Sequence, residues 1–153
     1  MTSLLVVRLG AMLLIPVVLA GCDAGVLDPE LDPEVGTFVT LVNDHRASIG
    51  CPRLAWNGDV AEVARDHSQD MIDRGFFAHT NPDGDSPADR LRGAGIDYRR
   101  MAENIAQGYG SGPDVLRAWL DSSGHRANIE NCQLLEHGVA VVGTTWTHLF
   151  ATL

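Results

Sequence analysis

The chain has 153 residues, which is enough for one domain with a hydrophobic core and too few for two ordinary domains. Apolar residues make up 45% of it and charged residues 20%, so a chain that is disordered throughout is excluded. The formal net charge of -9 excludes nucleic acid as an expected partner of the folded part.

Residues 1–21 are typical of a secretory signal peptide. Their apolar run, LGAMLLIPVVLA, follows one arginine and is too short for a dependable membrane span. The sequence Leu19-Ala20-Gly21-Cys22 resembles the bacterial lipobox, in which the cysteine is diacylated and becomes the new N-terminus. We therefore expect Cys22 to anchor the protein to a membrane. A conventional signal peptide that is cleaved nearby is the alternative.

Residues 22–34 repeat Asp-Pro and carry acids with little apolar content, which is typical of an extended spacer. The domain is expected to occupy residues 35–153. Apolar positions at helical spacing predict a first helix over residues 35–49, which Gly50 ends.

A second helix is expected between Asn57, which can cap it, and Gly75, which ends it. His67 lies on the apolar side of this helix, where a hydrogen-bonded core histidine is favoured over a ligand. The segment FFAHTNPDGDSP follows, and its two phenylalanines are expected to pack the helix end into the core. Asn81-Pro82-Asp83-Gly84 predicts a tight turn, and a short helix is expected over residues 87–92.

The glycine-rich stretch 102–112 predicts a brief strand or an irregular loop. Pro113 begins another helix, which breaks at Ser123-Gly124. Residues 137–143 and 144–153 then predict two strands of an antiparallel hairpin. Helices and strands are mixed without regular alternation, which favours an α+β layered domain over a doubly wound one.

Cys51 and Cys132 are the two cysteines left for the domain. In an exported protein they can form a disulfide, which would close a loop of roughly 80 residues and stabilise the fold by about 4 kcal/mol. Sequence spacing alone does not show that they meet, so two free buried cysteines remain the alternative.

Several polar residues fall at the predicted boundaries between elements, where a folded chain gathers functional groups. Histidine and glutamate among them can bind a divalent cation or transfer a proton. No HExxH, GxSxG, CxxC or phosphate-binding glycine motif supports a particular chemistry. The candidate residues are His79, Glu103, Ser122, His125 and Asn128.

Five ordered blocks resemble the CAP or SCP-like superfamily, which includes cysteine-rich secretory proteins and has a large bacterial branch. The blocks are HSQDM, GFFAHTNPDGDSPADRL, AENIAQG, AWLDSSGHRANIEN, and HGVAVVG with TTWTHLF, within residues 35–153. The resemblance implies a three-layer α-β-α sandwich with a central antiparallel sheet, which agrees with the α+β prediction.

The family carries two histidines and two glutamates around a cleft that sometimes holds a divalent cation such as zinc. By resemblance, His79, Glu103 and His125 take three of these positions and are the expected metal ligands. Ser122 stands where animal and plant members have the second glutamate, so one carboxylate is missing. Asn128 is expected to line the same cleft.

Three functions remain open from the sequence. The favoured one is a lipid-anchored, extracytoplasmic binding module without catalysis, whose cleft takes a lipid, cell-wall or protein ligand. The alternative is a metal-assisted or acid-base hydrolase, such as a peptidase, in which Glu103 activates water. The third is a structural component of the cell envelope. The missing carboxylate favours binding, because Glu103 would have to orient an imidazole and activate water at once.

Overall fold

The computed structural model describes residues 32–153. The predicted signal peptide, the predicted lipidation site Cys22 and nearly all of the predicted spacer lie outside these residues. Within the described part, no helix has the length and apolar character that crossing a membrane requires. The helices are α1 (Pro33–Ser48), α2 (Gly58–Asp73), α3 (Pro87–Gly93), α4 (Gly112–Asp121) and α5 (Ser123–Ile129), and the strands are β1 (Ala55–Trp56), β2 (Arg100–Gln107), β3 (Glu136–Val142) and β4 (Thr145–Thr152).

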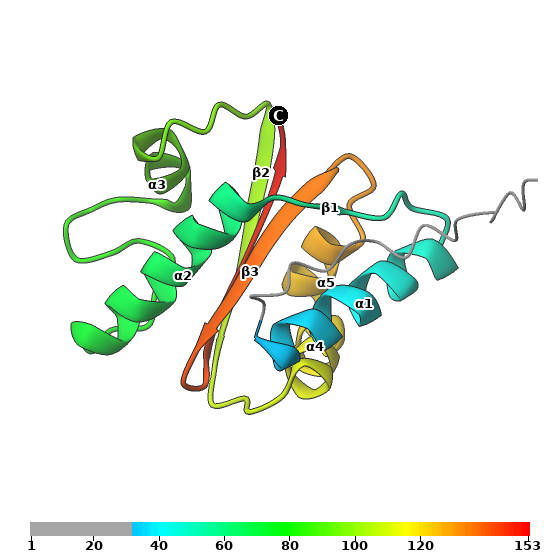
Figure 1. The fold of residues 1–153 in the computed structure, drawn as a ribbon, viewed down its shortest axis with the longest axis horizontal. Coiled ribbons are helices and arrows are strands. Elements are labelled where there is room, and N and C mark those ends of the chain that lie inside the picture. Colours follow the sequence, from blue (N-terminus) through cyan, green and yellow to red (C-terminus); the bar gives the residue numbers. More distant parts are fainter. Residues whose placement is uncertain (1–31) are drawn as a thin grey trace, which may run out of the picture.

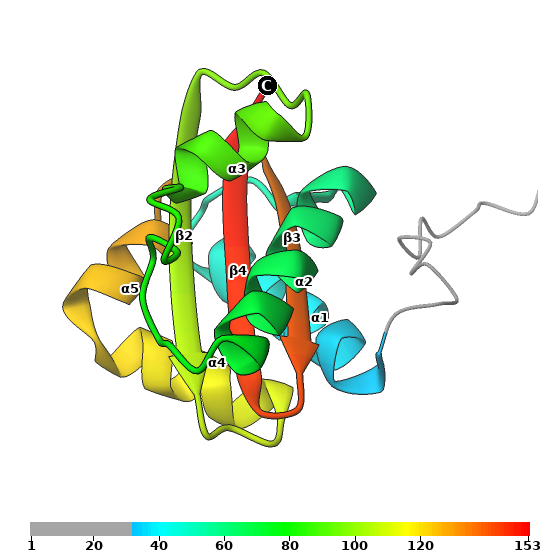
Figure 2. The same cartoon turned by 90° about the vertical axis from the view of Figure 1, so that its left-hand side faces the viewer.

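The chain forms the three-layer α-β-α sandwich that the sequence predicts. A single sheet has the strand order β1-β3-β4-β2, with α2 and α3 on one face and α1, α4 and α5 on the other (Figures 1 and 2). The predicted hairpin of β3 and β4 is present, and β2 pairs antiparallel with β4 along its whole length. Among the strands of residues 32–153, only β1 departs from the antiparallel pattern, because it pairs in parallel with β3 over two residues.

Separate apolar clusters hold the two helical layers on the sheet. On one face, Phe38 of α1 and Trp119 of α4 pack with Trp146 and Phe150 of β4. On the other face, α2 packs against Ala140 and Leu149 and approaches β3 most closely at Gly138. A Cβ atom at Gly138 would lie 2.1 Å from the backbone nitrogen of Ala61, so only glycine permits this contact. The position of α2 on the sheet therefore depends on that residue.

Helix α1 begins two residues earlier than the sequence analysis expects. The Asp32 side chain accepts a hydrogen bond from the Glu34 backbone N–H at 2.8 Å, and Pro33 occupies the first helical position. Asp-Pro is a favourable helix start, because the carboxylate caps a free N–H and proline lacks a donor where none is needed. The second Asp-Pro of the predicted spacer is thus the first turn of the domain.

Two further elements differ from their predicted form. Residues 100–107 form a complete strand, β2, where the sequence suggests a brief strand or a loop. The helix from Gly112 does break, but at Ser122, and a new helix, α5, starts at once at Ser123. The end of α2 also differs, because Phe77 is 48% exposed and only its neighbour Phe76 is partly buried.

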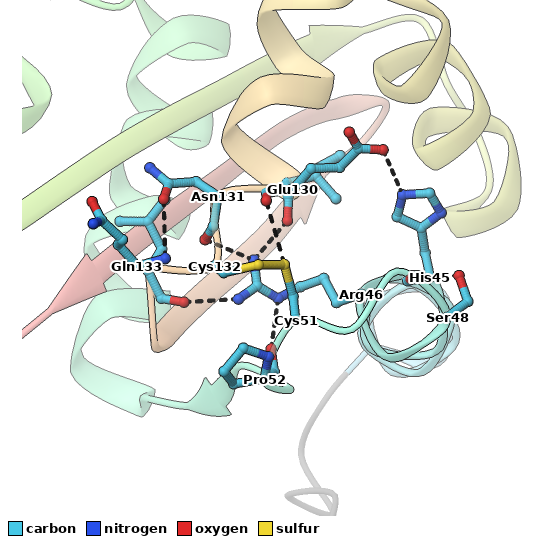
Figure 3. The surroundings of a disulfide bond; sticks show 11 residues. His45, Arg46, Ser48, Cys51, Pro52, Glu130, Asn131, Cys132 and Gln133 are labelled. Carbon is cyan, nitrogen blue, oxygen red and sulfur yellow. Dashed lines mark hydrogen bonds and ion pairs between the residues drawn. A yellow bond between two sulfur atoms is a disulfide. The ribbon is translucent and has the colours of Figure 1, made fainter.

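The predicted disulfide is present between Cys51 and Cys132, so the alternative of two free cysteines is wrong (Figure 3). It joins the loop after α1 to the segment before β3. Beside it, the fully buried Arg46 donates hydrogen bonds to the carbonyl groups of Pro52, Ile129 and Leu134 at 2.6 to 2.9 Å. The crosslink and this guanidinium together fix α1 to the chain that follows α5.

Candidate functional site

Glu103 is the buried centre of the candidate site. It lies on β2, an outer strand of the sheet, and its side chain is only 2% exposed. Side chains alternate along a strand, and that of the next residue, Asn104, bonds to α5 at the His125 carbonyl. The Glu103 carboxylate therefore points to the opposite layer, where the segment between α2 and α3 lies beside β2 (Figure 2).

His79 contacts this carboxylate from the segment between α2 and α3. Its Nδ1 lies 2.8 Å from Glu103 Oε1, while 52% of the imidazole side chain is exposed. The hydrogen bond to Glu103 raises the pKa of His79 above its ordinary value of 6.5, because the carboxylate stabilises the imidazolium. Glu103 thus fixes the ring, and the other ring nitrogen, Nε2, is left for an external ligand.

Arg90 of α3 completes the cluster, and sequence analysis does not identify it. Its Nη2 donates to Glu103 Oε2 at 2.6 Å, and its Nη1 donates to the His79 carbonyl at 2.8 Å. The Arg90 side chain is only 10% exposed. One guanidinium therefore neutralises the buried carboxylate and also holds the backbone that carries His79.

His125 approaches from the other helical layer, on α5. It is partly buried, and its pKa is lowered, first by burial and second by the positive charge of His79. His125 and His79 therefore reach β2 from opposite helical layers of the sheet (Figure 2). Within residues 32–153, the His125 ring makes no hydrogen bond to Glu103, so the histidines do not share that carboxylate.

The other two predicted site residues have different surroundings. Asn128 donates to the Asn104 side chain at 2.8 Å and to the Glu103 carbonyl at 3.3 Å, so it positions β2 beneath the site. Ser122 separates α4 from α5, is partly buried and makes no side-chain cap bond. No hydrogen bond in the described chain connects it to His79, Glu103 or His125.

No group of three His, Cys, Asp or Glu side chains in residues 32–153 is arranged to hold a metal ion. Both oxygens of Glu103 already accept hydrogen bonds, one from His79 and one from Arg90, so the predicted three-ligand set does not fit this arrangement. Glu103 instead orients the His79 ring through its hydrogen bond to Nδ1, as the outer partner of a histidine ligand does. His79 and His125 remain the predicted ligands that an experiment can test.

A cavity of about 240 Å³ adjoins the cluster on the side of α2. Arg90 and His67 line it, and the five predicted site residues do not. His67 is fully buried with its Nε2 3.0 Å from the Ala78 carbonyl, as expected for a hydrogen-bonded core histidine. Burial lowers its pKa, so the ring is neutral and supports the segment that leads to His79.

The domain is thus an α-β-α sandwich that carries a cluster of His79, Glu103 and Arg90 at its outer strand β2. Residues 39–150 match the model of the CAP family, described as the cysteine-rich secretory protein family. The chain therefore belongs to the CAP family.

The chain is similar to two proteins of Bacillus subtilis. It is 39% identical over 114 residues to the uncharacterized protein YkwD and 36% identical over 113 residues to the uncharacterized membrane protein YlbC. The matches cover 73% and 74% of this chain, but only 44% and 33% of those two proteins.

Among solved structures, the chain resembles an extracellular protein of Bacillus anthracis that contains an SCP domain. The TM-score is 0.76 at 32% identity, and the match covers 82% of this chain and 45% of that one. The family and the fold that the sequence predicts are both confirmed.

Proposed function

We propose that this protein is an extracytoplasmic, lipid-anchored binding module without catalytic activity, and that His79 and His125 form its recognition site. The observation that carries the proposal is the state of Glu103. This carboxylate is 2% exposed, and its two oxygens accept hydrogen bonds from His79 and Arg90. Glu103 therefore positions His79 and Arg90 and is not accessible to solvent.

Hydrolysis would require a base that reaches a water molecule. Glu103 cannot do so without giving up its hydrogen bond to His79 or to Arg90. His79 is accessible, but its raised pKa increases the fraction that is protonated at neutral pH, and an imidazolium does not accept a proton. Ser122, in place of a second carboxylate, supplies no other base. These features favour binding over catalysis.

The His79 side chain is 52% exposed, and its Nε2, which makes no hydrogen bond within residues 32–153, defines what the site can bind. When the ring is protonated, Nε2–H donates a hydrogen bond to an acidic group of a ligand. When the ring is neutral, Nε2 can bind a metal ion, and His125, whose pKa is lowered by burial, is the predicted second ligand. A divalent cation such as zinc would then link the module to an acidic group of a lipid, a cell-wall polymer or a protein.

The location outside the cytoplasm is supported by two independent features. The Cys51–Cys132 disulfide is typical of an oxidising compartment, and the similar Bacillus anthracis protein is extracellular. The lipobox at Cys22 supports attachment to a membrane, because several acyl chains on one residue give stable anchoring. A net charge of -9 disfavours nucleic acid as a partner.

Zinc titration by calorimetry, on protein stripped with a chelator, tests the site. The proposal predicts binding that His79→Ala and His125→Ala each weaken at least tenfold. His45→Ala is the matched control, because His45 is also a partly exposed histidine but pairs with Glu130 at 2.9 Å. Equal zinc uptake in all three variants would show that His79 and His125 are not zinc ligands.

The same proteins are then incubated with a mixed peptide library, with and without zinc. The proposal predicts no cleavage by any of them. Cleavage that is lost in His79→Ala and kept in His45→Ala would contradict the non-catalytic function and support the hydrolase alternative.

A further inference from the structure

The cavity of about 240 Å³ beside the cluster has a lining that the proposed function does not explain. Six of its seven lining residues are at least partly exposed, so a ligand can enter it. All seven are polar or charged, which disfavours an acyl chain or another apolar ligand. Helix α2 contributes Asp66, His67 and Asp70, and the loop before α3 contributes Asn81 and Asp83.

Two buried side chains of this cavity each have a nitrogen that lacks a hydrogen-bond partner within residues 32–153. They belong to His67, which is 1% exposed, and to Arg90, whose side chain is 10% exposed. His67 donates its Nε2–H to the Ala78 carbonyl at 3.0 Å, so its unpartnered Nδ1 is an acceptor, whereas the unpartnered Nε–H of Arg90 is a donor. Buried polar groups normally have a partner. Hydroxyl groups, which both donate and accept, would satisfy both nitrogens.

The charges of the cavity favour an uncharged ligand. Its two guanidinium groups are already paired, Arg74 with Asp70 and Asp83, and Arg90 with the buried carboxylate described above. Asp66 forms no ion pair within the described part of the chain, so it would repel a second negative charge. A metal ion would lack a set of three ligands among residues 32–153.

Phe77 lies beside this cavity and is the aromatic residue that the sequence analysis places in the core. Its side chain is 48% exposed, yet its backbone is fixed by the two residues that follow. The carbonyl group of Ala78 accepts a hydrogen bond from His67, and that of His79 accepts one from Arg90. Both donors line the cavity. A flat apolar surface is therefore held next to a polar cavity, in the segment between α2 and α3 (Figure 2).

We propose that the cavity binds an uncharged unit of a saccharide, whose hydroxyl groups bond to the polar lining and whose C–H face packs on the Phe77 ring. A sugar ring combines polar edges with a less polar face, and the electron-rich face of an aromatic ring attracts partly positive C–H groups. The inference rests on the proposed function, because it selects the cell-wall polymer among the ligand classes named there. The acidic group of that polymer contacts His79, and a neighbouring uncharged sugar occupies the cavity.

The probe is an array of neutral oligosaccharides, acidic oligosaccharides, acidic peptides and phosphatidylglycerol vesicles, applied to the full-length protein. We expect binding to oligosaccharides that contain an uncharged sugar, and the Kd of the best one is then measured by calorimetry. Binding to no saccharide, or tighter binding to the peptides or vesicles, would overturn the inference. The zinc titration reports on His79 and His125 and not on the cavity, so the two proposals can fail separately.

Substitutions on α2 test the polar lining. Asp66→Ala/Asp70→Ala removes two hydroxyl acceptors and should weaken saccharide binding about tenfold. Glu62→Ala/Asp73→Ala is the matched control, because it removes two exposed acids of the same helix that lie outside the cavity. Equal affinity of the two double variants would overturn the assignment of the cavity.

Substitutions of Phe77 test the apolar surface. Phe77→Ala should weaken saccharide binding about fivefold, and Phe77→Trp should restore it. Ile49→Ala is the control, because Ile49 is 46% exposed on the other helical layer. The zinc affinity should be the same in all three variants. Saccharide binding by Phe77→Ala that is as tight as that of Ile49→Ala would contradict the packing of a sugar on Phe77.

A last experiment leaves the protein unchanged and tests the buried nitrogens. Deoxy analogues of the bound sugar each lack one hydroxyl group. We expect one of them to bind at least about tenfold more weakly, because it leaves the nitrogens of His67 and Arg90 without a partner. Equal binding of all the analogues would show that no hydroxyl group reaches these nitrogens and would overturn the proposal.

Discussion

At the scale of single residues, the candidate site is a buried carboxylate held between the His79 imidazole and the Arg90 guanidinium. Glu103 is accessible to neither solvent nor a second histidine, yet it sets the orientation and charge of His79. A buried anion of this kind needs both neighbours, since an uncompensated charge in the interior is costly. The site is therefore also part of what stabilises the fold.

We predict that Glu103→Gln lowers the free energy of unfolding by about 3 kcal/mol, because it leaves the Arg90 guanidinium buried without a countercharge. Urea unfolding monitored by circular dichroism measures the change. The control is Asp44→Asn, which breaks an exposed pair with Arg53 and should cost no more than about 1 kcal/mol. Equal effects of the two substitutions would show that the Glu103–Arg90 pair is not structurally important.

Two of the predicted site residues contact one another, and the sequence misses a third member of their cluster for a physical reason. His79 and Glu103 do meet, and these positions come from the family resemblance, because spacing alone does not join residues 24 apart. Arg90 was missed because DRLRG contains two similar arginines. Arg90 points to Glu103, whereas Arg92 lies over the Tyr98 ring, and only the orientation of α3 in the fold distinguishes them.

At the scale of elements, helices with strong local signals were predicted well. Asn57 and Ser86 cap α2 and α3 as their positions suggest, because a capping side chain acts within its own turn. Strand β1 could not be predicted, since two residues carry no periodicity. Strand β2 was obscured by Glu103 and Asn104, two buried polar residues whose partners lie far away in the sequence.

The packing of α2 on β3 gives a prediction at this scale. Gly138→Ala should destabilise the protein by about 3 kcal/mol or more, because the new methyl group would overlap the backbone of Ala61 and force the helix away from the sheet. Gly93→Ala is the control, since a Cβ there meets no atom within 4 Å. Thermal unfolding of both variants measures the effect. A Gly138→Ala protein as stable as the control would mean that the helix does not pack this closely.

At the scale of the whole molecule, the core between the sheet and the α1–α4 layer contains an unusual polar pair. His137 Nδ1 and His148 Nε2 lie 3.0 Å apart, and both rings are fully buried. Burial lowers the pKa of His137 to about 3 and that of His148 well below 6.5, and the charge of the buried Arg46 lowers both further. The folded state therefore holds both rings neutral.

These pKa shifts determine how the free energy of unfolding changes as the pH falls. A histidine with a lowered folded pKa contributes its full stability above pH 6.5 and loses it as pH falls toward the folded value. Each ring should then lower the free energy of unfolding by about 1.4 kcal/mol per pH unit below pH 6.5. The lowered pKa of His67 likewise decreases the free energy of unfolding as the pH falls below 6.5. His79 acts in the opposite direction, because its raised pKa gives full stabilisation below pH 6.5, which is lost as pH rises through its folded value.

Urea unfolding at pH 7.5, 6.5, 5.5 and 4.5 measures this dependence, and His148→Leu removes one of the two buried rings. We predict that stability falls more steeply below pH 6.5 in the unchanged protein than in the variant. Parallel curves for the two proteins would show that His148 does not stay neutral in the folded state.

The most direct test of the central claim is an NMR pH titration of His79 and His125 in the unchanged protein and in Glu103→Gln. If Glu103 holds the ring of His79 for binding, the pKa of His79 lies above 6.5 and that of His125 lies below it. The Glu103→Gln substitution then strongly lowers the pKa of His79 alone. A His79 pKa at or below 6.5 that does not respond to Glu103→Gln would contradict the account.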